Sequence, residues 1–152
     1  MSGGVVFFEE FEKAGDEEFV SRRRTITEAD AVLFTSLTGI VDPVFTDEIF
    51  AREQLFGGRV VPGPMIMSYA MGLTDELGYG SVVAALGINN VRFMSPVRPQ
   101  DTIQVHSTVA STRPSESRPE LGIVTLQHQV VLQDERVAQS FERTLLVRRI
   151  PV

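Results

Sequence analysis

The sequence of 152 residues contains no cysteine, a single lysine and only two histidines. Without cysteine, disulfide bonds, thiolate metal ligands and cysteine nucleophiles are all excluded. No apolar run approaches the ~20 residues that cross a bilayer, and the first ten residues lack the basic and apolar pattern of a secretory signal. The net charge of −6 argues against a nucleic acid or an anionic membrane as the main partner. We therefore expect a cytoplasmic protein that binds neither nucleic acid nor membrane.

The composition is that of an ordinary globular protein, with 43% hydrophobic and 22% charged residues. A chain of this length can bury one real core but is too short for two comfortable domains. We therefore expect a single domain that spans residues 1–152.

Helix signals are concentrated in the first half of the chain. Residues 1–18 are rich in glycine and glutamate and predict a loose arm with one short strand or turn, and residues 18–26 resemble a strand. Thr27 is placed to cap a helix that Gly39 ends. Residues 41–46 are expected to be extended or turned because Pro43 disfavours the helical conformation of the residue before it.

Two further helices are predicted, a short one over residues 47–54 and a longer one from Pro64 to about Leu77. The longer helix is apolar nearly all round its surface, and such a helix is expected to be buried on most sides. The rest of the chain alternates in the manner of strands, and turn residues separate four of them. These strands cover residues 81–94, 102–112, 122–132 and 137–149. The pattern predicts an α+β fold in which an antiparallel β-sheet wraps around a central buried helix.

Several blocks of the sequence occur in the order of a known family. Residues 38–47 read Thr-Gly-Ile-Val-Asp-Pro-Val-Phe-Thr-Asp, and residues 56–65 read Phe-Gly-Gly-Arg-Val-Val-Pro-Gly-Pro-Met. They are similar to Thr-Gly-Asp-x-Asn-Pro-x-His-x-Asp and Phe-Gly-x-x-Ile-Ala-His-Gly-Met, and residues 25–30 and 90–101 match further blocks. The chain thus resembles the MaoC-like dehydratase or (R)-specific enoyl-CoA hydratase family, which implies a hotdog fold.

The resemblance also implies a function. Members of this family add water reversibly to a 2-enoyl-CoA thioester, which is a lyase reaction of fatty acid metabolism. The acyl-CoA would bind in a tunnel beside the interface of a homodimer, or of a heterodimer with a related hotdog chain. No cofactor is expected, because coenzyme A is part of the substrate.

The usual catalytic pair of the family is substituted. Ile40 stands at the position of the catalytic Asp and Phe45 at that of the catalytic His, and neither side chain can transfer a proton. The nearest ionisable substitute is Asp42, since residues i and i+2 of an extended segment point to the same side. Alternatively, Asp42 forms a turn with Pro43. Asp47 more simply caps the following helix than reacts.

The glycine of the family's His-Gly-Met segment is retained as Gly63. Its backbone N–H at the start of a buried helix would lie beside the thioester. Alternatively, the Pro-Gly-Pro segment is only a rigid turn. The resemblance places further substrate contacts at Pro62, Met65, Ser68, Arg92 and Arg98. The two arginines, and Arg59 with them, suit coenzyme A phosphates, although a solvated surface position is the simpler explanation for each.

The two histidines are not matched to the family's catalytic position. His106 alternates with polar residues and is expected to face solvent. His128 lies on an apolar strand face, where a buried core residue is the simpler reading and a catalytic role the other.

Three functions remain open from the sequence. The first is a MaoC-like hydratase with an unusual acid–base set centred on Asp42. The second is a non-catalytic hotdog subunit or thioester-binding module that partners a chain with an intact Asp–His pair. The third is a hotdog thioesterase, for which Asp75 and Glu76 lie far from Gly63 along the helix.

Overall fold

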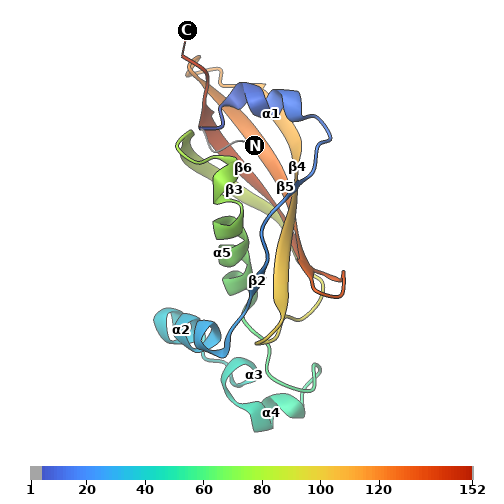
Figure 1. Ribbon diagram of the computed structural model, residues 1–152. Helices are drawn as coiled ribbons and strands as arrows, with labels where there is room; N and C mark the ends of the chain where they lie inside the picture. Colours follow the sequence, from blue (N-terminus) through green and yellow to red (C-terminus); the bar gives the residue numbers. More distant parts are fainter. Residues whose placement is uncertain (1–4, 152) are drawn as a thin grey trace.

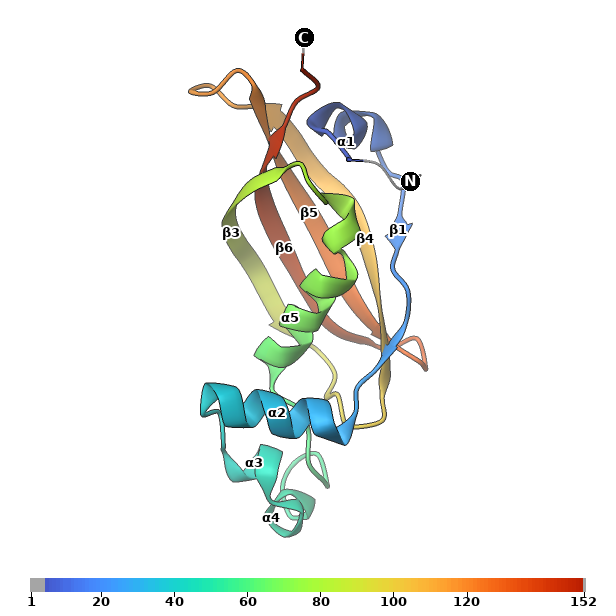
Figure 2. The same cartoon turned by 60° about the vertical axis from the view of Figure 1, so that its left-hand side comes forward.

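The computed structural model describes residues 5–151 and contains a six-stranded antiparallel sheet. Four long strands form most of it and are joined in the order β4-β5-β6-β3, while two short strands pair with the outer side of β4 (Figures 1 and 2). The long strands are β3 (Val82–Phe93), β4 (Thr102–Pro114), β5 (Leu121–Leu132) and β6 (Val137–Arg148), and the short ones are β1 (Phe19–Val20) and β2 (Arg24–Thr25). The four predicted long strands are therefore confirmed to within about two residues at each end.

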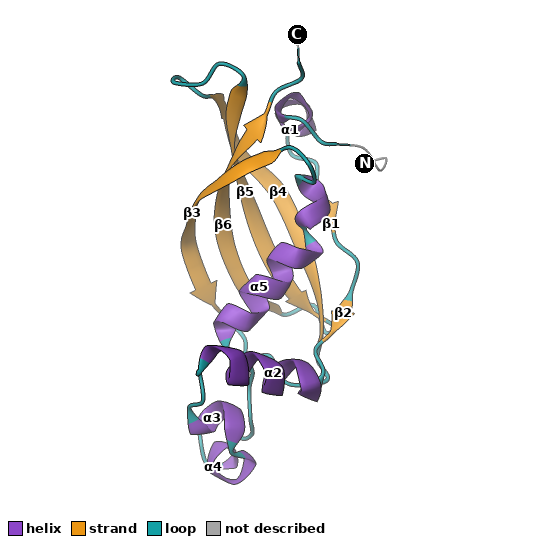
Figure 3. Cartoon of the chain, turned by 90° about the vertical axis from the view of Figure 1, so that its left-hand side faces the viewer, coloured by secondary structure: helices purple, strands orange, loops and turns teal. Residues whose placement is uncertain are grey.

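Helix α5 (Gly63–Leu73) lies across the inner face of this sheet (Figure 3). Its buried residues Met65, Ile66, Ala70 and Leu73 belong to one core cluster together with Phe141 of β6 and residues of β4 and β5. The β-branched, alternating strands supply one apolar face, and the apolar helix fills it. The α+β hotdog architecture expected from the sequence is confirmed.

Burial of α5 is less complete than its composition predicts. Pro64, Ser68 and Gly72 are spaced four residues apart and form one exposed stripe along the helix. The helix also ends earlier than expected, at Leu73, and a 3-10 turn, η1 (Asp75–Leu77), continues the chain. The expectation of burial on most sides is therefore confirmed, except along this one stripe.

The N-terminal arm is not loose. Within its described part it forms helix α1 (Phe8–Ala14), whose Phe8 and Phe11 side chains are buried against the sheet. Phe8 lies so close to Gly122 of β5 that a β-carbon there would be 2.1 Å from the ring. The prediction of a loose arm was wrong because these aromatic side chains bury enough apolar surface to hold a short helix. Residues 1–4 of that prediction lie outside the described residues.

Helix α2 (Glu28–Thr38) begins and ends where the sequence predicts. Thr27 accepts a hydrogen bond from the Asp30 N–H at 3.1 Å, and the Asp30 carboxylate accepts one from the Thr27 N–H at 2.9 Å. Gly39 takes up the left-handed conformation at φ 72° that ends the helix. None of the described helices is long and apolar enough to cross a membrane.

The segment expected to be extended or turned over residues 41–46 contains a short helix, α3 (Pro43–Thr46), which α4 (Glu48–Arg52) follows. Pro43 takes the first helical position, where its missing N–H is not needed. Asp42 keeps an extended conformation, as the residue before a proline should. Helices α2, α3 and α4 gather beyond the end of the sheet at which α5 begins (Figure 2).

Candidate functional site

A pocket of about 230 Å³ opens at the N-terminal end of α5. Its walls come from the α3 helix, the loop before α5, the first turn of α5, the end of β3 with the loop that follows it, and the start of β6. The lining residues are Phe45, Phe56, Val60, Val61, Gly63, Ile66, Phe93, Met94, Ser95, Pro96, Val97, Ala138 and Gln139. The walls are therefore mostly aromatic and aliphatic, as in pockets that bind organic ligands.

Gly63 lines this pocket and carries a backbone donor without a partner. It lies between Pro62 and Pro64, which have no N–H, so its amide is the one donor of this tripeptide. Among the described residues, the Gly63 N–H has no hydrogen-bond partner. Because it is the first amide of α5, it stands at the positive end of the helix dipole. This arrangement suits a carbonyl or other oxygen that carries partial negative charge.

Glycine is required at this position by a close neighbour. A β-carbon on Gly63 would lie 2.2 Å from Cε1 of Phe93, at the end of β3. The ring of Phe93 thus packs directly on the first turn of α5 and forms one wall of the pocket.

Phe45, at the family's histidine position, lines the pocket, whereas Ile40 is half-buried and lies outside its lining. None of the thirteen lining side chains is titratable. The pocket therefore offers an apolar wall where proton transfer would require an acid and a base.

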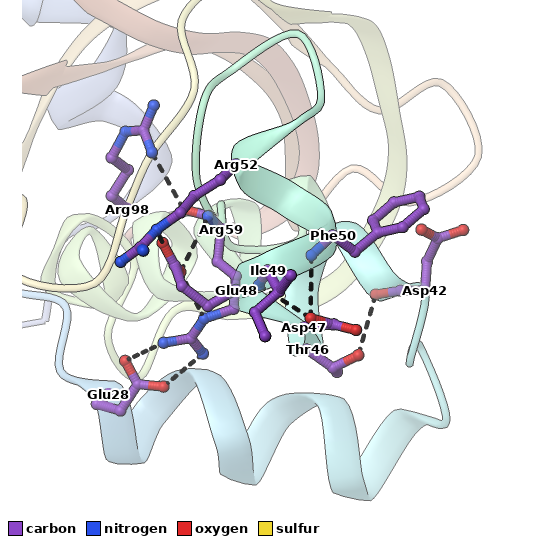
Figure 4. Close-up of polar contacts among 10 residues, drawn as sticks. All are labelled: Glu28, Asp42, Thr46, Asp47, Glu48, Ile49, Phe50, Arg52, Arg59 and Arg98. Carbon is purple, nitrogen blue, oxygen red and sulfur yellow. Dashed lines mark hydrogen bonds and ion pairs between the residues drawn. The ribbon is translucent and has the colours of Figure 1, made fainter.

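Asp42 does not reach the pocket lining. Its side chain is exposed, and its Oδ1 accepts a hydrogen bond from the Val44 N–H at 3.2 Å at the start of α3. In Figure 4 its carboxylate points away from the ion pairs around Glu48 and Arg59. The turn with Pro43 expected as one alternative is therefore present, and the catalytic role of Asp42 stays a prediction.

Asp47 caps α4, as predicted. Its Oδ1 accepts hydrogen bonds from the N–H groups of Ile49 at 2.9 Å and Phe50 at 3.0 Å (Figure 4). Both donors belong to the first turn of the helix, where they would otherwise lack partners.

Arg59 is engaged in protein contacts rather than free for phosphates. Its guanidinium bonds Glu28 of α2 at 2.7 Å and Glu48 of α4 at 3.0 Å (Figure 4). The hydrogen bonds from Arg59 hold the pKa of Glu48 below its ordinary value. These contacts tie α2 and α4 to the loop that leads into α5.

The other two arginines differ from each other. Arg98 donates to the backbone carbonyls of Phe56 and Arg59, so it also braces the loop before α5. Arg92 is exposed on β3, beside Ser140 of β6. Neither of them lines the pocket at Gly63.

The remaining predicted contacts are spread around α5. Pro62 is buried at the cap of the helix, and Met65 is buried in the core beneath it. Ser68 lies on the exposed stripe, where its hydroxyl donates to the Pro64 carbonyl at 2.9 Å. None of the three lines the pocket, so only Phe45 and Gly63 of the predicted positions come together there.

His128 is a buried residue of β5. Its Nδ1 lies 2.7 Å from the Ser107 hydroxyl, and its ring is tilted against Phe141 with centroids 5.0 Å apart. Burial, with a smaller contribution from the Arg143 charge, lowers the pKa of His128 to about 3. The expected core location is confirmed, and the imidazole is neutral at ordinary pH. His106 is half-buried and lies 3.2 Å from Glu18.

Asp75 and Glu76 occur in η1, at the opposite end of α5 from Gly63. A helix of eleven residues is about 16 Å long. Neither carboxylate lines the pocket at Gly63. A thioesterase that used them would have its catalytic carboxylates at one end of the helix and the Gly63 N–H at the other.

Eleven of the thirteen lining residues were not predicted as site residues from the sequence, among them Phe56, Phe93, Ser95 and Gln139. Gln139 carried only a weak signal: it is a polar residue on a strand face with Phe141, Leu145 and Val147, but Arg143 lies on that face too. The other three lie in loops or at a strand end, where periodicity gives no orientation.

The protein is a hotdog protein with an apolar pocket at the first turn of its central helix. Comparison with known proteins shows to which family of this fold the chain belongs. The model of the MaoC like domain matches residues 10–131. The chain therefore belongs to the MaoC-like domain family, and the resemblance read from its motifs is confirmed.

Individual relatives agree with this family. Protein MaoC of Klebsiella aerogenes is 43% identical over 102 residues, which are 67% of this chain and 30% of that protein. The 3-hydroxybutyryl-CoA dehydratase of Methylorubrum extorquens is 30% identical over 142 residues, 89% of this chain and 84% of that one. The crystal structure of the MaoC-like dehydratase from Rhodospirillum rubrum has a TM-score of 0.84 at 29% identity and covers 97% of this chain and 99% of that chain. The chain thus spans less than a third of the length of the Klebsiella protein.

Proposed function

We propose that this chain binds acyl-CoA thioesters, with the thioester carbonyl at the Gly63 N–H and the acyl group in the pocket beside it. The unpaired N–H at the start of α5 belongs to Gly63, a residue that lines a pocket with apolar walls, and this observation carries the proposal. The names of several relatives also support it, since they act on CoA thioesters.

The chemistry of the family requires more than binding. Hydration of a 2-enoyl thioester needs a general base for water and a general acid for Cα, each worth about 10²–10⁴-fold in rate. No titratable side chain lines the pocket, and Phe45 fills the place of the expected histidine. The geometry therefore favours a thioester-binding subunit that turns over slowly by itself and partners a chain with an intact Asp–His pair.

Hydration through Asp42 is the second candidate. Asp42 is the one ionisable residue between the two substituted positions, and its carboxylate is exposed at the start of α3. A movement of the loop before α3 would be needed to bring it to the pocket.

The edge of the sheet supports a dimer. β3 is paired with β6 on one side only among the described residues, and it exposes the apolar side chains of Val82, Val83, Leu86 and Ile88. Long apolar edge strands are rarely left uncovered. We propose that a second copy or a related hotdog chain pairs at β3.

One assay separates these roles. The purified chain is mixed with trans-2-butenoyl-CoA, and binding is measured by calorimetry while the ultraviolet absorbance of the conjugated enoyl thioester reports hydration. We expect binding with little loss of absorbance. Rapid hydration that Asp42→Asn abolishes would replace the subunit role by the Asp42 mechanism, and failure to bind would exclude both.

A further inference from the structure

The side chain of Gln139 is buried without a partner. It is 1% exposed, and neither its Nε2 nor its Oε1 forms a hydrogen bond within residues 5–151. Buried polar atoms without a partner are found on two other described residues, His128 and Arg143, but each of those leaves a single nitrogen unpaired. Among these three residues of the described structure, Gln139 is therefore the one in which every polar atom of the side chain lacks a partner.

Such an exception is expensive in a stable fold. An unpaired buried polar group destabilises the folded state, whereas an apolar side chain of similar shape would cost nearly nothing. Native proteins satisfy most buried polar side chains, and the remaining ones call for an explanation. A ligand that supplies the missing partner would provide one.

Gln139 lies where a ligand is expected. It lines the pocket of Gly63 from β6, directly opposite Phe93 of β3 in the register of the two strands. Phe93 in turn packs on Gly63. The strand β6 and the first turn of α5 therefore bring two residues with unpaired polar groups, Gln139 and Gly63, to the lining of the same small pocket.

The rest of the lining offers little competition for the polar part of a ligand. Apart from Gly63 and Gln139, the half-buried Ser95 is the one lining residue with a polar side chain. A carbonyl oxygen has two lone pairs and accepts two hydrogen bonds. One donor from the helix and one from the sheet can therefore hold the same oxygen.

We infer that Gln139 is a substrate-binding residue whose Nε2 donates to the thioester carbonyl oxygen, beside the Gly63 N–H. This inference rests on the proposed acyl-CoA binding and adds a residue to that site. The pair polarises the carbonyl by hydrogen bonds from uncharged donors. It also gives the apolar pocket a means to distinguish a thioester from an analogue without the oxygen.

The test compares two ligands that differ by this oxygen. Butanoyl-CoA carries the thioester carbonyl, S-butyl-CoA lacks it, and neither can be hydrated. Dissociation constants are measured by calorimetry for wild type, for Gln139→Met, and for Gln129→Met, a control on an exposed position of β5. Methionine keeps the length of the side chain and removes its amide.

Wild type and Gln129→Met should prefer butanoyl-CoA by roughly ten- to a hundredfold, the size of two hydrogen bonds. Gln139→Met should lose about three- to tenfold of this preference, the share of one hydrogen bond, bind S-butyl-CoA as wild type does, and melt at the same or a higher temperature. In difference infrared spectra with a ¹³C-labelled carbonyl, the thioester band should lie at higher frequency in Gln139→Met than in wild type.

An unchanged preference in Gln139→Met, or equal weakening of both ligands, would overturn the role of Gln139 and leave acyl-CoA binding intact. If wild type bound neither ligand, the proposed function and this inference would both fail.

Discussion

The ring of Phe93 occupies the space that any side chain on Gly63 would need: a β-carbon there would lie 2.2 Å from Cε1 and 2.7 Å from Cδ1 of the ring. The ring at the end of β3 is thus in direct contact with the first turn of α5, and both residues line the pocket. Glycine at position 63 leaves the backbone amide open and lets the ring close one wall.

Replacement of Gly63 by alanine should therefore disturb the site more than the fold. The exposed ring of Phe93 must move to make room for the new methyl group, and this overpacking costs about 1–3 kcal/mol of stability. We expect the affinity for butanoyl-CoA to fall about tenfold. Gly72→Ala on the same helix is the matched control, because nothing lies within 4 Å of the added carbon. That control should bind normally and gain about 0.5–1 kcal/mol of stability. Equal binding by the two variants would refute the contact.

The missing acid–base pair predicts that hydration can be restored. In the double variant Ile40→Asp/Phe45→His, the new imidazole takes the place of a ring that lines the pocket. We expect hydration of trans-2-butenoyl-CoA to rise at least about 10²-fold above wild type, measured by loss of the enoyl absorbance. Ile40→Asn/Phe45→His retains the shape without the carboxylate and should show little of this gain. If Ile40→Asp/Phe45→His folded and bound ligand but hydrated trans-2-butenoyl-CoA no faster than wild type, the placement of the reaction site at this pocket would be contradicted.

The cap on α4 predicts a local effect on stability. Asp47 satisfies two N–H groups of the first turn, so Asp47→Ala should lower the free energy of unfolding by about 1 kcal/mol. Asparagine accepts the same hydrogen bonds, and Asp47→Asn should lose much less. Urea denaturation measures both, and similar losses in the two variants would be inconsistent with capping.

His128 predicts that stability falls in mild acid. Its pKa is lowered by burial, to about 3 in the folded chain from an ordinary value of 6.5. The unfolded chain therefore binds a proton that the folded chain does not. The resulting stability is fully present above about pH 6.5 and is lost as the pH falls toward 3, by roughly 2 kcal/mol between pH 6.5 and pH 5.

Urea denaturation at several pH values checks this dependence. His128→Gln should flatten it, whereas His106→Gln, on the half-buried histidine beside Glu18, should leave most of it in place. If the two variants lost stability in acid equally with wild type, the titration of His128 would not be the cause.

Much of the fold could be predicted because its signals are local. The Thr27 and Gly39 boundaries of α2 and the four long strands follow from capping and alternation, and the structure reproduces them. The helix α1 was missed because Phe8 and Phe11 are stabilised by contacts with distant strands, among them the approach of Phe8 to Gly122. Such a contact has no signature in the residues near α1.

The candidate site was less accessible to sequence reasoning. Motif positions identified Gly63 and Phe45, which do meet at the pocket. The arginines looked suited to phosphates, but Arg59 and Arg98 bond carboxylates and carbonyls of the protein, and this depends on tertiary structure. Gln139 was overlooked because its meaning comes from the lack of a partner, which only the packed structure reveals.

The central claim is that the pocket at Gly63 recognises the acyl thioester of a CoA ligand. It is tested most directly by calorimetric titration of the purified wild-type chain with butanoyl-CoA and, separately, with free coenzyme A. The account predicts that butanoyl-CoA binds at least about tenfold more tightly, because its acyl group buries apolar surface worth ~0.8 kcal/mol per CH₂ in addition to the carbonyl contact. Equal affinity for the two ligands, or binding of neither, would contradict it.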